Sequence, residues 1–174
     1  MSPLRNHRGF TLIELIITVG IVGVVMAVTV PTLLRARMSG NEVSAIASLR
    51  TINTAQSAYA GVASDGNYAS ELSVLTRPCP GGTQGFLSSE FAADPAQKSG
   101  YAIVLDAGGS AAGPLDCNGT ASRRGYYLSG IPIASGRTGV RSFATSNAGV
   151  IYFNQSGAPP TEAQIAAGTG TPIQ

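Results

Sequence analysis

An almost unbroken apolar run extends from Phe10 to Val30, close to the start of the chain. This run is about as long as the ~20 residues that a helix needs to cross a bilayer. Glu14 is its only charged residue. The pattern therefore predicts a membrane-spanning helix close to the N-terminus.

A different pattern follows Pro31. Apolar residues recur at helical spacing at Val43, Ile46, Leu49, Ile52 and Tyr59, with Ala45, Ala55 and Ala60 between them. This predicts an apolar stripe on a helix, and the polar residues expected to face elsewhere are Ser44, Ser48, Arg50, Asn53 and Gln56. Gly61 and Asp65-Gly66 supply a stop signal. We expect one long helix from Phe10 to about Val62, roughly 80 Å in length, in which Pro31 can form a kink.

The remainder of the chain reads as short strands and loops. The runs predicted as strands are 101–105, 125–133, 140–145 and 150–154, and the last two flank a hairpin turn at 146–149. Pro132 favours an edge position for its strand. The segment 72–75 reads as a short helical or extended piece, and the Pro-, Ala- and Gly-rich tail from Ala158 is expected to be poorly ordered. The expected fold is α+β, a long N-terminal helix packed on a small antiparallel sheet of three to four strands.

Composition argues against several classes of protein. The formal net charge of +2 is too small for a dedicated nucleic-acid binder. The only histidine is His7, and the sequence has no phosphate-cradling glycine motif and no cluster of metal ligands. Three aspartates, Asp94, Asp106 and Asp116, are spread out along the chain. We expect no enzymatic activity, no cofactor and no metal site.

Two cysteines, Cys79 and Cys117, are the whole complement. In an exported domain such a pair predicts one disulfide, whereas in a cytosolic protein it predicts two free thiols. The membrane segment upstream favours export, and hence the disulfide.

The N-terminal motif is the most specific signal. A short basic leader with Arg5 and Arg8 ends at Gly9, and residues 9–31 then read GFTLIELIITVGIVGVVMAVTVP. The combination of Gly9, Phe10, a glutamate at position 14 and an apolar run ending at Pro31 closely resembles the N-terminus of type IV prepilins and type II secretion pseudopilins.

The resemblance implies how the N-terminus is processed. A prepilin peptidase would cut between Gly9 and Phe10 and methylate the new N-terminal Phe10. The leader 1–9 would be removed, the helix 10–62 would follow with 10–30 as its membrane or filament-core part, and 63–174 would form a globular head.

Glu14 and the helix breakers have two interpretations each. A carboxylate in hydrocarbon needs a partner, and the resemblance supplies the α-amino group of Phe10 on a neighbouring subunit; the alternative is an interfacial side chain that stays hydrated. Gly20, Gly23 and Pro31 either let the helix bend as a subunit leaves the bilayer or are simply tolerated, as in many membrane helices.

By resemblance, the chain is a structural subunit of a type IV pilus-like filament that serves adhesion, twitching motility or DNA uptake. It would be a single-pass inner-membrane protein before assembly, and then part of a surface pilus or a periplasmic filament of a bacterium. Its partners would be further copies of itself, the prepilin peptidase, a pilus assembly platform and minor pilins. The alternatives are a type II secretion pseudopilin and, from another class, a monomeric signal-anchored periplasmic binding domain.

Two weaker signals lie in the C-terminal part. A basic patch of Arg123, Arg124, Arg137 and Arg141 would suit DNA, although a solvated face is the favoured interpretation. The sequence DCNGT, from Asp116 to Thr120, resembles a bacterial glycan acceptor at Asn118, and here chance is the favoured interpretation.

Overall fold

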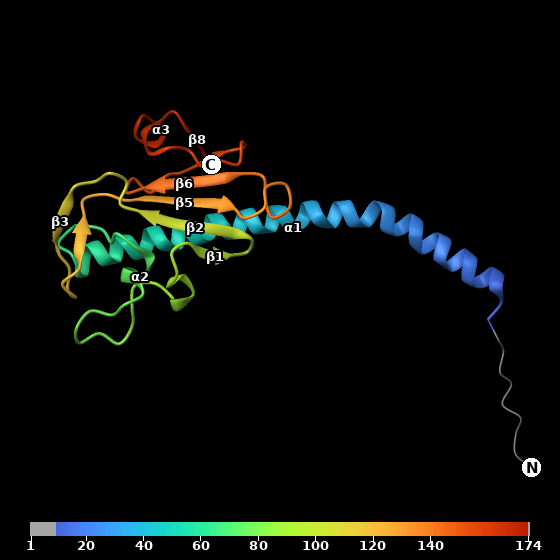
Figure 1. Ribbon diagram of the computed structural model, residues 1–174, viewed down its shortest axis with the longest axis horizontal. Helices are drawn as coiled ribbons and strands as arrows, with labels where there is room; N and C mark the ends of the chain where they lie inside the picture. Colours follow the sequence, from blue (N-terminus) through green and yellow to red (C-terminus); the bar gives the residue numbers. More distant parts are fainter. Residues whose placement is uncertain (1–9, 174) are drawn as a thin grey trace, which may run out of the picture. The chain divides into compact units, whose positions relative to one another are not determined.

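The computed structural model describes residues 10–173. Contacts divide the chain into a first unit that ends at Ala36 and a second unit that begins at Arg37. Helix α1 (Leu12–Val62) runs through this boundary and includes Pro31. The second unit carries all the strands of the described chain (Figure 1).

The C-terminal half of α1 forms part of the core of the second unit. Its buried apolar residues recur with helical spacing and are Ala45, Leu49, Ile52, Ala55, Tyr59 and Ala60. The predicted stripe is confirmed at these positions but is wrong at Val43, which is 62% exposed. Ser48 and Gln56, expected to face away, are buried. The buried face of the helix is therefore partly polar. Its buried polar side chains are tolerated because they form hydrogen bonds within the second unit.

The second unit contains a six-stranded antiparallel sheet in the order β1-β2-β5-β6-β7-β8. A separate two-stranded sheet pairs β3 with β4. The strands are β1 (Ala96–Lys98), β2 (Tyr101–Asp106), β3 (Ala112–Leu115), β4 (Ala121–Arg123), β5 (Tyr127–Pro132), β6 (Ser142–Ser146), β7 (Ile151–Asn154) and β8 (Thr171–Pro172).

The α+β fold class is confirmed, and the sheet is larger than the expected three to four strands. The four predicted strands correspond to β2, β5, β6 and β7. The strands that the sequence did not reveal have two to four residues each, too few for an alternating pattern to show.

The edge position expected for the strand with Pro132 is wrong. Strand β5 is central and pairs with both β2 and β6. Pro132 is its last residue and lies opposite Tyr101 of β2, whereas the pairing with β6 stops at Gly130. The missing N–H of proline therefore removes no hydrogen bond between β5 and β6.

The tail from Ala158 was expected to be poorly ordered, and this is wrong. It contains helix α3 (Glu162–Ala166) and strand β8, which pairs with β7. Thr161 and Gln164 form a capping box at the start of α3. The segment 72–75 is helix α2 (Leu72–Leu75), and a 3₁₀ turn, η1 (Ser89–Phe91), follows it.

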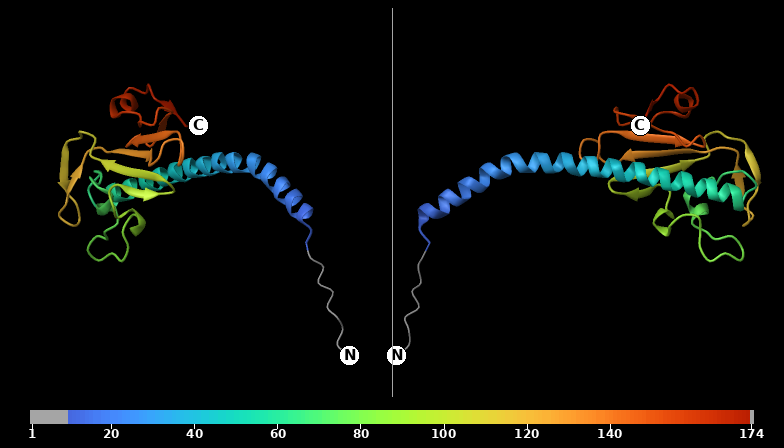
Figure 2. Two further views of the ribbon diagram at one scale, coloured as in Figure 1. Left: turned by 45° about the vertical axis from the view of Figure 1, so that its right-hand side comes forward. Right: turned by 180° about the vertical axis from the view of Figure 1, so that it is seen from behind.

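The core lies between α1 and the six-stranded sheet. Its largest fully buried side chains include Tyr59, Leu49, Tyr101, Ile103 and Phe143. Two views of the second unit place the β3–β4 sheet beside the C-terminal end of α1 and the loop between β5 and β6 at the opposite end of the sheet (Figures 1 and 2).

Candidate functional site

The first unit presents an apolar surface that no other residue between 10 and 36 covers. Every large apolar side chain from Phe10 to Leu34 is about half exposed or more, with Phe10 at 79%. Helix α1 is long and apolar enough to cross a membrane, and no residue of its most apolar 18-residue stretch is buried. Since such a surface is costly in water, it requires lipid or other protein around it.

The hydroxyl groups of this segment are already satisfied within the helix. Thr18 donates to the carbonyl of Leu15, Thr29 to that of Val25, and Thr32 to that of Val28, at 2.8–2.9 Å. In an apolar environment an unpaired hydroxyl would be expensive. The three threonines are thus compatible with burial in lipid or in a filament core.

Glu14 has a hydrogen-bonding partner in its own chain. The backbone N–H and the hydroxyl of Thr11 both donate to Oε2 of Glu14, at 3.0 and 2.7 Å. The backbone N–H of Glu14 in turn donates to Oγ1 of Thr11 at 3.3 Å. This reciprocal arrangement is a capping box, which the sequence TLIE from Thr11 to Glu14 signals but which our sequence interpretation missed. Oε1 accepts no hydrogen bond from residues 10–173, so one carboxylate oxygen is held and the other is available.

The remaining residues predicted for this segment show no packing role among residues 10–173. A Cβ added at Gly20 or Gly23 would meet none of their atoms within 4 Å, so no contact among them requires glycine there. Pro31 lies inside a helix that continues past it. Gly9, the predicted peptidase site, and the basic residues of the leader lie outside the described residues.

In the second unit, a buried carboxylate ties α1 to the β5–β6 loop (residues 133–141). Glu42 is 7% exposed. Its Oε1 accepts the backbone N–H groups of Val140 and Arg141 at 2.9 and 3.1 Å, and its Oε2 accepts both Nε and Nη2 of Arg141 at 2.8 Å. Burial by itself would raise the pKa of the Glu42 carboxyl, but these donors outweigh it and hold the pKa below its ordinary value.

Further polar side chains of α1 fix the helix against the sheet and the turn beyond it. Gln56 exchanges two hydrogen bonds with the backbone of Ala69, at 2.9 and 3.0 Å. Asn53 accepts the hydroxyl of Tyr126 at 3.0 Å and donates to Thr145 at 3.2 Å. Each of these bonds joins a particular side chain of α1 to a particular group outside the helix. Rotating α1 about its axis would break them, so they fix the rotation of the helix as well as its position.

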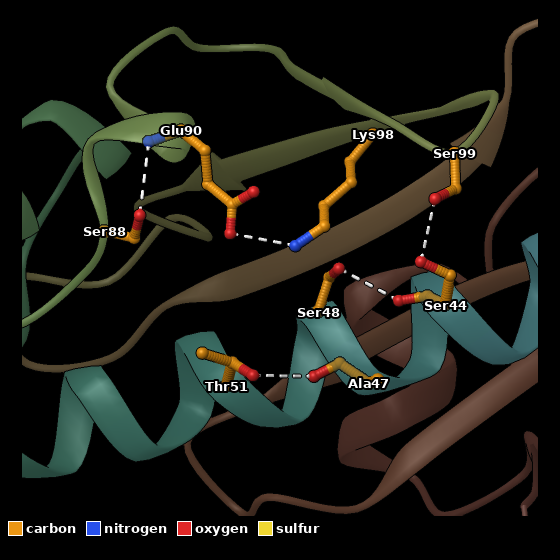
Figure 3. A network of polar contacts seen from close by, with 8 residues as sticks. All are labelled: Ser44, Ala47, Ser48, Thr51, Ser88, Glu90, Lys98 and Ser99. Carbon is orange, nitrogen blue, oxygen red and sulfur yellow. Dashed lines mark hydrogen bonds and ion pairs between the residues drawn. The ribbon is translucent and has the colours of Figure 1, made fainter.

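The β1–β2 turn also contacts α1. Figure 3 shows Ser44 of the helix facing Ser99, with their hydroxyl oxygens 2.9 Å apart. In the same view Lys98 reaches Glu90 of the 3₁₀ turn at 2.9 Å (Figure 3). This ion pair is exposed and therefore weakly stabilising, so the buried contacts of Glu42 and Gln56 are the main polar ties of α1.

The predicted disulfide is confirmed. Cys79 and Cys117 are bonded, with their Cα atoms 5.5 Å apart and a sequence separation of 38. The bond links the loop after α2 to the turn between β3 and β4. On the chain-entropy estimate, closing a loop of this length stabilises the fold by about 4 kcal/mol.

Asp116 of the predicted glycan motif organises the β3–β4 turn. Its Oδ1 accepts the backbone N–H groups of Asn118 and Thr120, at 2.9 and 2.7 Å, and its Oδ2 accepts the hydroxyl of Tyr59 at 2.8 Å. Burial, and secondly the nearby Asp116 carboxylate, raise the pKa of Tyr59. These bonds give Asp116 a structural role that does not depend on a glycan at Asn118.

The four arginines of the predicted basic patch are not brought together. Arg141 is bound to Glu42, whereas Arg123 pairs through its backbone with Tyr68, beyond the far end of α1. Glu42 and Val62, the last residue of α1, are about 30 Å apart along the helix. No single basic surface for a nucleic acid is therefore formed by these four side chains.

Among residues 10–173, no three His, Cys, Asp or Glu side chains are grouped so that they could hold a metal ion.

Comparison with known proteins places the similarity at the N-terminus. The family model described as the prokaryotic N-terminal methylation motif matches residues 4–30. The Thermus thermophilus protein named "Type IV wide pilus major component PilA4" is 49% identical over 39 residues. That match covers 22% of this chain and 30% of the relative. No solved structure is significantly similar to the chain.

The comparisons agree with the geometry of the first unit. The matched residues 4–30 include the capping box of Thr11 and Glu14 and the exposed apolar part of α1 up to Val30. The N-terminal segment of this chain therefore carries a prokaryotic N-terminal methylation motif and is homologous to that of a type IV pilin subunit.

Proposed function

We propose that this chain is a structural subunit of a type IV pilus-like filament. The observation that carries the proposal is the apolar N-terminal part of α1, which matches a methylation motif and has no cover among residues 10–36. Glu14 is the only charged residue between Phe10 and Leu34. A surface of this kind suits lipid before assembly and neighbouring helices afterwards.

In this proposal a prepilin peptidase removes residues 1–9 and methylates Phe10. The helix of residues 10–62 then anchors the subunit in the inner membrane, with residues 10–30 in the bilayer, and residues 63–174 form the head outside it. An assembly platform transfers the subunit into the filament, together with minor pilins, and the apolar helix moves from lipid to the filament core.

Glu14 is the docking residue in this scheme. Its Oε2 is held by the two donors of Thr11, which fixes the carboxylate at the first turn of the helix. Oε1 is left for a second donor, the α-amino group of processed Phe10 on a neighbouring subunit. Because both charges would be poorly solvated in the filament core, pairing them sets the axial register between subunits.

Gly20, Gly23 and Pro31 serve helix flexibility in this scheme. The open space around both glycines supports the proposal, because no contact within the described part of the chain accounts for them. Because glycine has no side chain, these positions also permit a neighbouring helix to approach closely in the filament core.

Mass spectrometry of the protein in filaments sheared from the cell surface tests the proposal. A chain that begins at methylated Phe10 in this fraction is the expected result. Processed protein that stays in the membrane fraction would instead favour a type II secretion pseudopilin. An intact leader from Met1 to Gly9, with no polymer, would overturn the proposal and favour a signal-anchored binding domain.

A further inference from the structure

The β5–β6 loop is an exposed but well-braced projection at one end of the second unit. Within the loop, the N–H of Thr138 donates to the carbonyl of Ala134 and that of Gly136 to the carbonyl of Gly139, each at 2.9 Å. Asn41 of α1 donates to the carbonyl of Thr138 at 2.9 Å. The loop thus keeps one conformation, which lowers the entropy lost on docking.

The side chains that this loop exposes combine apolar surface with one positive charge. Ile133 is 53% exposed and Val140 is 44% exposed. Arg137 lies between them, is exposed, and forms no ion pair within residues 10–173. The loop therefore exposes two aliphatic side chains and, between them in the sequence, a guanidinium without an ion pair among the described residues.

A shallow, open depression of about 500 Å³ lies at the C-terminal end of α1. We call it the α1-end hollow; residues 61–65 and 114–117 line it. Val62 and Leu115 at its wall are 74% and 67% exposed. Its lining carries two carboxylates and no basic residue: Asp116 already accepts three hydrogen bonds, whereas Asp65 is exposed and unpaired within the described chain.

The β5–β6 loop and the C-terminal end of α1 lie at opposite ends of the second unit (Figure 2). The hollow lies at that end of α1. Helix α1 gives the scale, because Asn41 touches the loop and Val62 lines the hollow, about 30 Å further along the helix. The two surfaces of one molecule therefore do not meet each other. The loop of one molecule is instead complementary to the hollow of another. Each surface exposes two aliphatic side chains, and the loop carries a positive charge where the hollow carries a negative one.

We propose that the β5–β6 loop of one copy of this chain docks into the α1-end hollow of a second copy. Ile133 and Val140 then contact Val62 and Leu115, and the guanidinium of Arg137 faces the carboxylate of Asp65. The two surfaces differ, so the contact is heterologous and propagates into an open filament rather than closing a dimer. The inference rests on the proposed filament function and assigns the contact between successive subunits to particular residues.

This contact is small and does not hold two free subunits together. Stable interfaces bury about 1,200–2,000 Å² in total, well beyond what four aliphatic side chains and one ion pair supply. In a filament the apolar helices already hold the subunits side by side, so the effective concentration of loop and hollow is high. The contact then selects one arrangement of neighbouring subunits.

Disulfide trapping in assembled filaments tests the contact in the full-length protein. Val62→Cys combined with Val140→Cys places one thiol on each surface, and both positions are exposed. The expected result is a ladder of cross-linked oligomers on a non-reducing gel of sheared filaments, which each single variant lacks. Val62→Cys with Arg124→Cys is the matched control, because Arg124 is exposed but belongs to neither surface. Intact filaments without a ladder would overturn the inference and leave the proposed function standing.

Charge substitution tests the ion pair separately. Arg137→Glu is expected to lower the yield of sheared filaments roughly two- to fivefold, the effect typical of one exposed charge pair. Asp65→Asn is expected to restore much of that yield in the Arg137→Glu background, and asparagine tolerates the positive φ of position 65. An equal loss with or without Asp65→Asn would show that the two side chains do not face each other. Absence of filaments from the wild-type chain would instead remove the proposed function and the inference together.

Discussion

Glu42 offers the sharpest quantitative prediction, because one buried carboxylate accepts four N–H donors. The substitution Glu42→Ala removes the acceptor for the backbone of Val140 and Arg141 and for two nitrogens of the Arg141 side chain. That side chain stays in place over Phe143 and Phe153, with its guanidinium carbon 5.7 and 5.4 Å from the ring centroids. The guanidinium is then left without its counter-ion.

The expected cost is about 2–3 kcal/mol in the free energy of unfolding. Breaking a fully buried ion pair costs roughly 3–5 kcal/mol. Here the side chain of Arg141 is 36% exposed, so water still solvates part of its guanidinium after the carboxylate is removed. The expected cost therefore lies below the range for a fully buried pair. For a unit of this size, such a loss lowers the melting temperature by roughly 6–10 °C.

Thermal and urea unfolding of the detergent-solubilised full-length protein would measure this loss. Glu42→Gln is the matched control, since its amide oxygen still accepts backbone N–H groups but carries no charge. The pKa of Glu42 is lowered in the folded state. Its contribution to stability is therefore present above the ordinary glutamate pKa of about 4.3 and is lost as the pH falls through the lower folded value. The difference between wild type and Glu42→Gln should persist from pH 7 to about pH 5 and shrink in more acidic solution.

Two results would refute the argument. If Glu42→Ala unfolds within about 0.5 kcal/mol of wild type, as a neutral surface substitution does, the carboxylate is not a stabilising tie. If the difference between wild type and Glu42→Gln instead grows as the pH falls, the sign of the pKa shift is wrong.

Three further predictions concern the N-terminus and the disulfide. Glu14→Val should still insert in the membrane yet assemble inefficiently, as fractionation and electron microscopy of filaments would show; abundant filaments made only of this variant would contradict the docking role. Thr11→Val removes the hydroxyl of the capping box and should reduce filament yield, whereas Thr11→Ser keeps the box and should assemble like wild type. Equal yields from both variants would show that the box does not position Glu14. Replacing Cys79 and Cys117 together by serine should lower the free energy of unfolding by about 4 kcal/mol in urea titrations, and an unchanged midpoint with an unchanged m-value would contradict the loop-closure estimate.

Several features of this chain follow from local sequence alone. A long run of apolar residues predicts the helix of the first unit, because length and composition suffice for that inference. Three-residue and four-residue spacing predicts most of the buried face of the second half of α1. Both capping boxes, at Thr11 and Thr161, also have a local signature, a threonine followed three positions later by glutamate or glutamine.

The short strands depend on long-range partners and were not predictable in the same way. Strand β8 has two residues and exists because β7 offers it an unpaired edge. Pro132 suggested an edge strand, but only the register with β6, which ends at Gly130, makes a proline acceptable in a central one. Such facts concern pairs of segments far apart in the sequence, and a local pattern carries no information on them.

The tertiary structure alone decided the roles of the polar residues. The sequence determined an apolar helix with a methylation motif and one charged residue, since these are properties of consecutive positions. It could not reveal that Glu42 and Gln56 are buried, because burial of a polar group depends on whether folding supplies its partners. Nor could it place Arg137 and Asp65 at opposite ends of the second unit, since that arrangement exists only once α1 spans the sheet between them.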